Sequence, residues 1–391
     1  MIETNIGLFN ESFPPVMDGV AVCVENYAHW MQEKVGGVAV VTPRNPGADY
    51  SDKAYEVLDY MSVPVPFRAP YVTGISEMDP AFLKELLQRR FKIVHAHSPF
   101  VAGKTAARVA RLQKIPLVAT FHSKYREDFA RVIPGQAMLD VVVKEIVRFY
   151  KRADAVWVPQ ESVKDVLYSY GYKGKPIDVM PNGCDMAGDY PESFFREARA
   201  SLGLADGLFT MLYVGQHIWE KNLRLTIEAL ARIKDLPYRM FFVGTGYAEG
   251  EMKELVGRLG ISDKITFAGR VTDRERLKQF YAAADLFLFP SLYDTDGLVV
   301  REAAALGTPS VMLREASASG MLSDGETGFK IAGSLDDFEA LLRALAADPA
   351  RLQAVGRSAR GIVRSWQDVA EEALDRYNAL LTRRFLIHPL T

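Results

Sequence analysis

Short apolar runs alternate with stretches of helical periodicity along most of this chain. Each run has the length of a buried strand, and the intervening segments have the length and spacing of amphipathic helices. The runs fall at residues 6–9, 38–41, 93–97, 117–121, 155–158 and 177–180, and then at 209–215, 240–243, 265–268, 286–289 and 310–313. Strands that alternate with helices predict an α/β protein with parallel sheets covered by helices.

The runs form two series, which suggests two domains. Between them, residues 184–208 are polar and rich in helix-breaking residues, so we interpret this segment as a linker. We predict two doubly wound domains that face an interdomain cleft, residues 1–185 and residues 205–369. The last segment, 370–391, is expected to be a helix that either caps its own domain or packs back on the first, and we assign it to the first domain.

Composition and charge narrow the class of protein. A formal net charge of −2 over 391 residues argues against a globally basic nucleic-acid binder, so we expect no nucleic-acid partner. The two cysteines, Cys23 and Cys184, lack metal-binding spacing, which favours a reducing cytoplasm and no structural zinc. The first residues do not resemble a signal peptide, and no apolar run approaches the ~18 residues of a membrane span.

The segment 289–309 is the most informative part of the sequence. It joins a buried strand to a helix through an acidic turn, and open α/β sheets bind ligands at such junctions. Asp294 lies in the turn, and Gly297 and Leu298 begin the helix, whose first N–H groups can bind an anion. Glu302 follows about one helical turn later. Carboxylates beside a helix N-terminus suit a ligand with hydroxyl and phosphate groups, such as a nucleotide sugar.

Three further positions are candidates for ligand contacts, each with a simpler alternative. Gly19 ends the loop after the first strand and either lets backbone N–H groups bind a phosphate or only forms a turn. His122, at the carboxyl end of a predicted central strand, either hydrogen-bonds a substrate hydroxyl or is a buried structural histidine. Lys221 either reaches a diphosphate or is a solvated surface lysine.

Other patterns favour different chemistry. We expect His95 and His97 to face opposite sides of their strand and therefore not to bind a metal together. The glycine-rich segment 244–250 follows a strand and precedes a helix, as in NADP-dependent oxidoreductases, although the acidic residue expected after the next strand is absent. Asp294 and Asp296 form either a magnesium-binding pair or, for Asp296, a solvated acidic turn.

Taken together, the motifs resemble those of the family-4 retaining glycosyltransferases, which have the GT-B fold of two Rossmann-like domains. The resemblance covers almost the whole chain. It rests on the first strand with its loop to Gly19, on residues 94–99, 120–122, 181–185 and 214–215 with Lys221, and on residues 267–271, 290–309 and 324–329.

The resemblance implies roles for the matching residues. Gly19 would approach the donor diphosphate, Lys221 would neutralise it, and Glu302 would hold the ribose hydroxyls. His122 and Asp294 would contact the transferred sugar as the catalytic residues. The complete set of donor-binding positions is Gly19, Gln216, Lys221, Val271, Gly297, Leu298 and Glu302.

The family also implies a mechanism without a cofactor. Protein cations and helix N-termini would stabilise the leaving diphosphate, so no metal site is expected. The acceptor would attack the face that the phosphate leaves, which retains the anomeric configuration. Backbone groups around Val271 would contact the base.

The chain departs from the family pattern at three places. Gln216 replaces an arginine, Asp294 replaces a glutamate, and residues 316–320 lack the usual glutamate of a late glycine loop. Loss of the arginine removes a charge-assisted contact of about 1.5–3 kcal/mol. A noncatalytic nucleotide-sugar-binding paralogue or partner subunit therefore remains an alternative.

Residues 120–129 and 314–320 look most similar to bacterial diacylglycerol glycosyltransferases. Residues 122–152 are also basic and amphipathic, which suits either an anionic membrane surface or a core helix with a solvated face. We predict a cytoplasmic, peripheral enzyme on the inner face of the membrane that transfers glucose from UDP-glucose to a lipid hydroxyl such as that of diacylglycerol. A saccharide or other small acceptor is the alternative.

Overall fold

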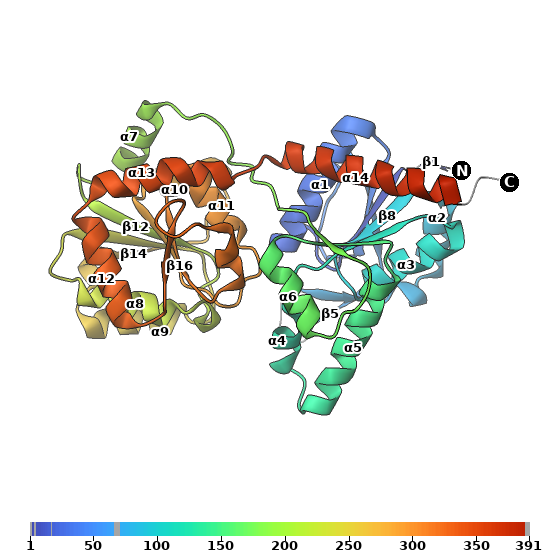
Figure 1. Ribbon diagram of the computed structural model, residues 1–391, viewed down its shortest axis with the longest axis horizontal. Coiled ribbons are helices and arrows are strands. Elements are labelled where there is room, and N and C mark those ends of the chain that lie inside the picture. Colours follow the sequence, from blue (N-terminus) through green and yellow to red (C-terminus); the bar gives the residue numbers. More distant parts are fainter. Residues whose placement is uncertain (1, 4, 17, 66–70, 388–391) are drawn as a thin grey trace. The chain divides into compact units, whose positions relative to one another are not determined.

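A computed structural model describes residues 2–3, 5–16, 18–65 and 71–387, without the side chains of residues 2, 3 and 384–387. The chain forms two compact units, and Figure 1 labels the helices and strands of each. The N-terminal unit comprises residues 1–183 and 366–391, and the C-terminal unit comprises residues 184–365.

A parallel sheet of seven strands forms the centre of the N-terminal unit. Its order is β11 (Ile177–Val179), β10 (Ala155–Val158), β9 (Leu117–Thr120), β8 (Ile93–Ala96), β2 (Ile6–Phe9), β3 (Val38–Pro43) and β4 (Glu56–Tyr60). Chain order reverses between β2 and β8, which makes this point the topological switch where open sheets bind ligands. Two small sheets add β1 (Ile2–Glu3) with β7 (Arg89–Arg90), and β5 (Ser62–Pro64) with β6 (Val72–Gly74).

Helices cover both faces of this sheet. They are α1 (Gly19–Val35), α2 (Pro80–Gln88), α3 (Val101–Gln113), α4 (Tyr125–Ala130), α5 (Gln136–Arg152), α6 (Glu161–Ser169) and α14 (Trp366–Ile387), with the 3-10 turn η1 (Ser76–Met78). Every residue of β2, β3, β8, β9 and β10 is buried, as expected for parallel strands between two helical layers. The helix α14 packs against α1, so the last helix belongs to the unit that contains the first strand.

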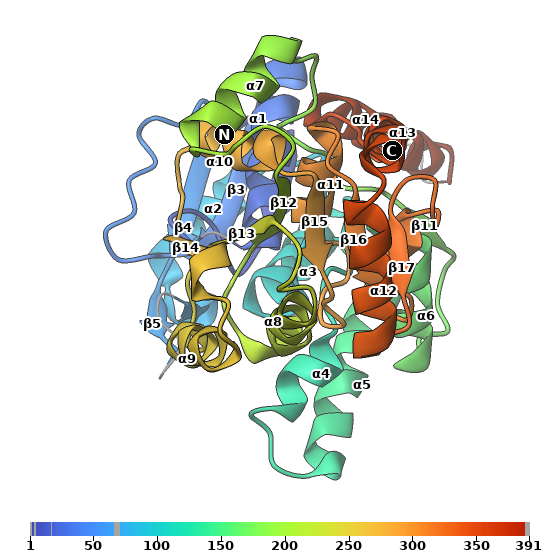
Figure 2. The same cartoon turned by 90° about the vertical axis from the view of Figure 1, so that its left-hand side faces the viewer.

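The C-terminal unit has a parallel sheet of six strands. Figure 2 turns this unit toward the viewer, and the strands follow one another as β14 (Ile265–Gly269), β13 (Tyr238–Val243), β12 (Phe209–Val214), β15 (Leu286–Phe289), β16 (Ser310–Leu313) and β17 (Phe329–Ile331). This is the Rossmann order 3-2-1-4-5-6, with its switch point between β12 and β15. The α-helices are α7 (Glu192–Ser201), α8 (Leu223–Arg232), α9 (Glu249–Leu259), α10 (Arg274–Ala283), α11 (Leu298–Ala305), α12 (Leu335–Ala346) and α13 (Pro349–Ala359). The 3-10 turns are η2 (Trp219–Lys221), η3 (Ser262–Lys264), η4 (Ser317–Met321) and η5 (Arg360–Ile362).

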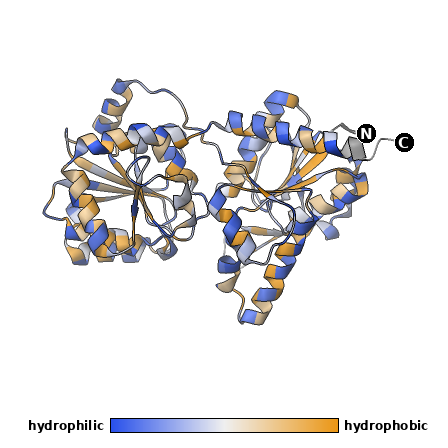
Figure 3. Ribbon diagram, viewed as in Figure 1, coloured by the Kyte–Doolittle hydropathy of each residue, from blue (hydrophilic) through white to orange (hydrophobic). Residues whose placement is uncertain are grey.

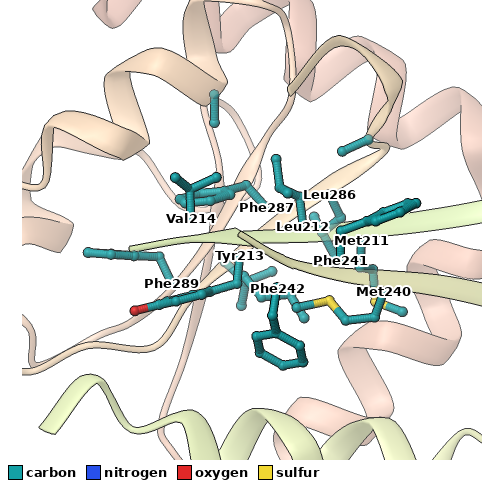
Figure 4. Packing of buried hydrophobic residues seen from close by; sticks show 14 of the residues in the cluster. Met211, Leu212, Tyr213, Val214, Met240, Phe241, Phe242, Leu286, Phe287 and Phe289 are labelled. Carbon is teal, nitrogen blue, oxygen red and sulfur yellow. The ribbon is translucent and has the colours of Figure 1, made fainter. Parts of the chain in front are cut away.

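Aromatic side chains fill much of the C-terminal core. Figure 4 shows Tyr213, Phe242, Phe287 and Phe289 packed around the central strands, and each is at most 2% exposed. Tyr213 brings a hydroxyl into this core, and that hydroxyl donates to the backbone oxygen of Gln216 at 2.9 Å. The core therefore fixes the start of the loop after β12 by a hydrogen bond as well as by packing.

The predicted fold class of two Rossmann-like domains is confirmed, and hydrophobic residues concentrate on the strands of both units (Figure 3). The predicted linker 184–208 differs from the structure, because it contains α7, which packs against α10 in the C-terminal unit. Ala198 of α7 is buried and Phe194 and Phe195 pack against the C-terminal core, so a short amphipathic helix lies between the two stretches of helix-breaking residues. No helix in the described part of the chain combines the length and hydropathy that crossing a membrane would require.

Candidate active site

The switch point of the C-terminal unit brings two predicted site residues together. β12 and β15 are paired neighbours, Lys221 lies in the loop after β12, and Asp294 lies in the loop after β15. The Nζ of Lys221 donates to Oδ1 of Asp294 in a close ion pair. Lys221 is only 9% exposed, and its ammonium also lies 5.7 Å from the ring centre of Phe289 and 5.2 Å from that of Tyr293. It is therefore not the solvated surface lysine of the alternative interpretation.

The second carboxylate oxygen of Asp294 can accept a hydrogen bond from a ligand. Oδ2 is buried and has no hydrogen-bond partner among the described residues. An unsatisfied buried acceptor typically costs about 1–3 kcal/mol, and a charged one costs more. A hydroxyl group of a ligand would remove that cost by donating to Oδ2.

The helix α11 begins directly after this carboxylate. Gly297 is its N-cap and has φ = 74°, a left-handed conformation that favours glycine, and no side chain caps the helix. Leu298 is the first helical residue, so the first N–H groups of α11 are not bound by a capping side chain. Such N–H groups, together with the helix dipole, attract an anion. Gly297 and Leu298 therefore lie where the sequence predicted an anion-binding turn.

Glu302, on the first turns of α11, is held by two donors. Arg274 Nη2 donates to Oε1 at 2.8 Å, and the Tyr281 hydroxyl donates to Oε2 at 2.7 Å. Arg274 also binds Asp185 through Nε at 2.9 Å. Each oxygen of Glu302 keeps a second lone pair, so the carboxylate can still accept ribose hydroxyls. The predicted residue is thus pre-oriented for that role.

Sequence reasoning missed the two residues that orient Glu302. Arg274 and Tyr281 lie seven positions apart on α10, which places both on the same face of that helix. Both residues could be seen in the sequence. However, many helices have an arginine near their start and a tyrosine among their apolar residues without either residue having a function. Burial and the neighbouring Glu302 raise the pKa of Tyr281 well above its ordinary value, so its hydroxyl remains a donor.

The remaining donor-binding predictions in this unit fall on loops. Gln216 is exposed just after β12, and its side chain brings no positive charge to the site. Val271 is half-buried and follows β14, two strands away from β12. Both follow the carboxyl ends of strands, and their contacts with the donor remain predictions.

Two alternative interpretations of this unit are not supported. Asp296 is 5% exposed and binds Arg301 through both oxygens, at 2.9 and 3.3 Å, so it is neither a solvated turn residue nor a free metal ligand. A Cβ on Gly244 would lie 1.9 Å from the oxygen of Gly215, and one on Gly246 would lie 2.2 Å from that of His217. These glycines are required by packing between two loops, which removes the reason for a dinucleotide interpretation.

In the N-terminal unit, His122 belongs to a cluster of buried histidines. His122 follows β9, is 7% exposed, and its Nε2 lies 3.0 Å from Nδ1 of His97, which follows β8. His95 Nε2 lies 2.7 Å from the Thr120 hydroxyl, and its Nδ1 lies 2.6 Å from the Tyr377 hydroxyl on α14. The cluster therefore connects the carboxyl ends of two central strands to the last helix.

The prediction that His95 and His97 face opposite sides was wrong. Their ring centres are 4.0 Å apart, because residues two apart along a strand project to the same face. Burial lowers the pKa of each well below its ordinary value, so both rings are neutral. His97 Nε2 is buried and has no hydrogen-bond partner among the described residues. Burying an unpaired N–H there would cost more free energy than burying an unpaired lone pair. We therefore place the His97 proton on Nδ1, where it is donated to His122.

This cluster also contains the residues best able to hold a metal in the described chain. Cys23 Sγ and one nitrogen from each of His97 and His122 lie within 4.8 Å of one another. A thiol with imidazoles suits zinc or copper(I) rather than magnesium. The Cys23 thiol already donates to Asn182 Oδ1 at 3.4 Å. The absence of a required metal remains a prediction.

The loop after β2 differs from the predicted phosphate cradle. Gly19 is exposed and begins α1, but Asp18 Oδ1 accepts from the N–H groups of Val20 and Ala21 at 3.0 and 2.8 Å. Earlier in the loop, Glu11 Oε1 accepts from the backbone N–H of Ala102 at 2.6 Å. A diphosphate at Gly19 would therefore meet N–H groups that a carboxylate already binds.

Glu11 is a second residue that sequence reasoning missed. It is an acid in the loop that the sequence singled out, but the charge of its environment could not be predicted without the fold. Burial raises its pKa from 4.5 to about 7, despite hydrogen bonds from Ala102 and Val101 that lower it. Such a group at a switch point is a candidate for a functional role.

Comparisons with known proteins agree with this geometry. Residues 194–361 match the family model described as Glycosyl transferases group 1, and residues 17–187 match that of Glycosyltransferase Family 4. The chain is 30% identical over 345 residues to the D-inositol 3-phosphate glycosyltransferase of Nocardia farcinica (strain IFM 10152), covering 84% of this chain and 74% of that protein.

Two further likenesses cover most of the chain. It is 28% identical over 357 residues to the alpha-monoglucosyldiacylglycerol synthase of Streptococcus pneumoniae (strain ATCC BAA-255 / R6), covering 88% of this chain and 79% of that protein. The crystal structure of Anabaena Alr3699/HepE in complex with UDP and glucose superposes with a TM-score of 0.76 at 18% identity, covering 96% and 100% of the two chains. The chain therefore belongs to the glycosyltransferases of group 1 and family 4, and it is a hexosyltransferase with the GT-B fold.

Proposed function

We propose that this enzyme transfers glucose from UDP-glucose to a lipid hydroxyl, such as that of diacylglycerol, with retention of configuration and without a metal. The observation that carries the donor side is the ion pair of buried Lys221 and partly buried Asp294 beside the N-terminus of α11. It combines a cation for the diphosphate with a carboxylate oxygen, Oδ2 of Asp294, that lacks a donor among the described residues. A nucleotide sugar supplies both a phosphate and a hydroxyl.

The proposed reaction uses charge stabilisation rather than a protein base. The bond between the sugar C1 and the β-phosphate oxygen breaks, and C1 bonds to the acceptor oxygen on the same face. The acceptor proton passes to the leaving phosphate, which balances the step. Lys221 and the N-terminus of α11 would stabilise the charge that develops on that phosphate, and His122 would hydrogen-bond the sugar.

Two named proteins support the choice of substrates. The solved relative from Anabaena was crystallised with UDP and glucose, and the pneumococcal relative is named as a glucosyldiacylglycerol synthase. Residues 122–152 give independent support for a lipid acceptor. Val132, Met138 and Val141 are exposed apolar residues in a basic segment, which suits contact with an anionic membrane. Leu139 and Ile146, by contrast, are buried in the core.

The test is a coupled assay on the full chain with EDTA present. UDP-, GDP- and ADP-sugars are offered with and without diacylglycerol in anionic micelles, and nucleotide release and glycolipid mass are followed together. We expect UDP release coupled to an α-linked glucolipid, with the anomer assigned by NMR. Turnover only with sugars or other small acceptors would replace the lipid, and a requirement for metal would overturn the proposed mechanism.

A noncatalytic nucleotide-sugar binder is the second candidate. It is favoured by the exposed, uncharged Gln216, where the family usually has an arginine, and by Asp18, which occupies N–H groups of α1. This candidate predicts that UDP raises the melting temperature while no sugar is transferred. Turnover gained by Gln216→Arg would support it, whereas turnover by the unmodified chain would exclude it.

A further inference from the structure

A cavity of about 960 Å³ opens on the N-terminal unit and is not lined by any of the candidate site residues. Its lining includes Leu117, the first residue of β9, and Asp154, which directly precedes β10. His122 follows the opposite, carboxyl end of β9. The volume is in the range of roughly 300–1,000 Å³ found for small-molecule sites. The cavity is therefore a separate place where a ligand could bind.

The floor of this cavity is largely apolar. Val101, Ala107, Ile115 and Phe149 line it from α3 and α5 and from the turn between α3 and β9. Two buried hydroxyls, those of Ser76 and Thr105, hydrogen-bond each other at 2.9 Å. The Thr105 hydroxyl also donates to the backbone oxygen of Val101 at 2.8 Å. Because these polar groups already have partners, the floor offers hydrocarbon contact to an occupant.

The rim is basic, and its charges come from two helices. The cationic residues that line the cavity are Lys104, Arg108 and Arg111 of α3, and Arg148 and Arg152 of α5. Residues spaced by three or four share one face of a helix, so each helix turns its basic stripe toward the same cavity. The sequence spacing and the cavity lining thus agree.

The three acidic residues at the cavity offset only part of the charge of the five cations on this rim. Glu145 binds Arg148 on its own helix. Asp154 accepts from the N–H of Leu117 at 2.9 Å and lies 3.3 Å from Lys175, which is outside the lining. The third acid, Glu77, is exposed in η1. Clustered cations around a concave, partly apolar surface produce a positive potential that an anion would relieve.

We propose that this cavity binds one molecule of an anionic phospholipid, with the phosphate at the basic rim and part of an acyl chain on the apolar floor. A free phosphate would leave the floor exposed to water, and a neutral lipid would leave the rim unpaired. The site is also distinct from a diffuse attraction to membranes, because it selects one molecule through a defined set of side chains. The proposal does not depend on which acceptor the enzyme glucosylates.

The experiment measures binding of a water-soluble, short-chain phosphatidylglycerol to the full chain by isothermal titration calorimetry, below its micelle concentration. Short-chain phosphatidylcholine and inorganic phosphate are the comparison ligands. The test variant is Arg108→Gln with Arg152→Gln. Its matched control is Lys144→Gln with Lys151→Gln, which removes the same charge from exposed residues of α5 that do not line the cavity. Ala107→Leu fills the floor without changing charge.

We expect one phosphatidylglycerol per chain, binding weakened about tenfold or more by the arginine pair, and a change of less than about twofold for the lysine pair. Ala107→Leu should also weaken binding. Equal losses for the two charge pairs would show diffuse surface attraction and overturn the site. Equal binding of inorganic phosphate would reassign the cavity to a soluble anion, and no binding of phosphatidylglycerol would also refute the proposal. Circular dichroism of each variant separates misfolding from loss of the site.

Discussion

The two units share a doubly wound sheet with one switch point each, but they hold their candidate ligand-binding side chains in different electrostatic states. In the C-terminal unit, Lys221 is paired with Asp294, and Glu302 with Arg274. In the N-terminal unit, burial keeps His97, the partner of His122, neutral. Charge is thus arranged in advance in one unit, while the other offers mainly neutral hydrogen-bonding groups.

Each electrostatic state suits a different kind of ligand group. Preorganised charges stabilise a diphosphate without reorganisation, and neutral imidazoles bind hydroxyls without requiring a counter-ion. Glu11 is the exception in the N-terminal unit, because its pKa of about 7 lets it change charge near neutral pH. The comparison can therefore be tested by removing charge from one unit and hydrogen bonds from the other.

The largest effect is expected for Lys221→Met. Loss of a preorganised cation should lower kcat by about 10²–10³-fold, and the partly buried Asp294 carboxylate would lose its cation, which costs about 1–3 kcal/mol of stability. Adding Asp294→Asn should restore much of the melting temperature but not turnover. Lys278→Met, a partly buried cation elsewhere in the unit, is the control. Wild-type turnover in Lys221→Met would remove the donor assignment.

The next effect concerns Glu302→Gln and the ribose. A hydroxyl that donates to a charged acceptor contributes about 1.5–3 kcal/mol, so UDP should bind about 10–100-fold more weakly. Calorimetry with UDP and 2′-deoxy-UDP makes the test specific. The native enzyme should discriminate between the two ligands, and the variant should bind both alike. Persistent discrimination in the variant would place the ribose elsewhere.

The fold and the polar candidates at strand ends were predictable, because buried parallel strands are continuous apolar runs and their carboxyl ends meet at one edge. The edge strand β4 was missed, since only Leu58 and Tyr60 of its residues are buried. The partners of the site residues were missed for a different reason. Arg274 reaches Glu302 from another helix, and no local pattern encodes that contact.

The histidine cluster shows the same limit. His122 was identified by its position at a strand end, but its neighbour His97 was assigned to the wrong side of the sheet. The state of Glu11 depends on burial by residues distant in sequence, which no pattern in its own loop reveals. Sequence therefore locates candidate groups, whereas charge and tautomer depend on tertiary packing.

The pH dependence of the protein's stability should reveal the raised pKa of Glu11. Its folded-state pKa is raised from 4.5 to about 7, so the folded protein binds the proton more tightly than the unfolded chain. Stability from this group is complete below pH ~4.5 and is lost as pH rises through ~7, a change of about 1–3 kcal/mol. Melting curves between pH 5 and 8 should fall less steeply for Glu11→Gln. The control Glu77→Gln should follow the native curve, and a native-like slope in Glu11→Gln would contradict the assignment.

A smaller effect is expected for His97, which positions His122. Removing one hydrogen bond in His97→Ala should lower kcat about 2–10-fold with little change in KM. His97→Asn keeps a donor close to the position of Nδ1 and should recover most of that loss. The ¹⁵N shifts of His122 report its tautomer directly. They should show a proton on Nδ1 in the native protein, and a proton on Nε2 would reverse the assigned direction of the bond.

The most direct comparison of the two units uses two buried tyrosines. Tyr281 donates to the Glu302 carboxylate at 2.7 Å, and Tyr377 lies 2.6 Å from the imidazole Nδ1 of His95. Hydrogen bonds to charged groups contribute about 1.5–3 kcal/mol and neutral ones about 0.5–1.5 kcal/mol, so Tyr281→Phe should destabilise its unit about 1 kcal/mol more than Tyr377→Phe. Urea denaturation of both variants measures the difference. Equal losses would mean that Arg274 already neutralises Glu302, and the electrostatic contrast between the units would then be confined to Lys221 and Asp294.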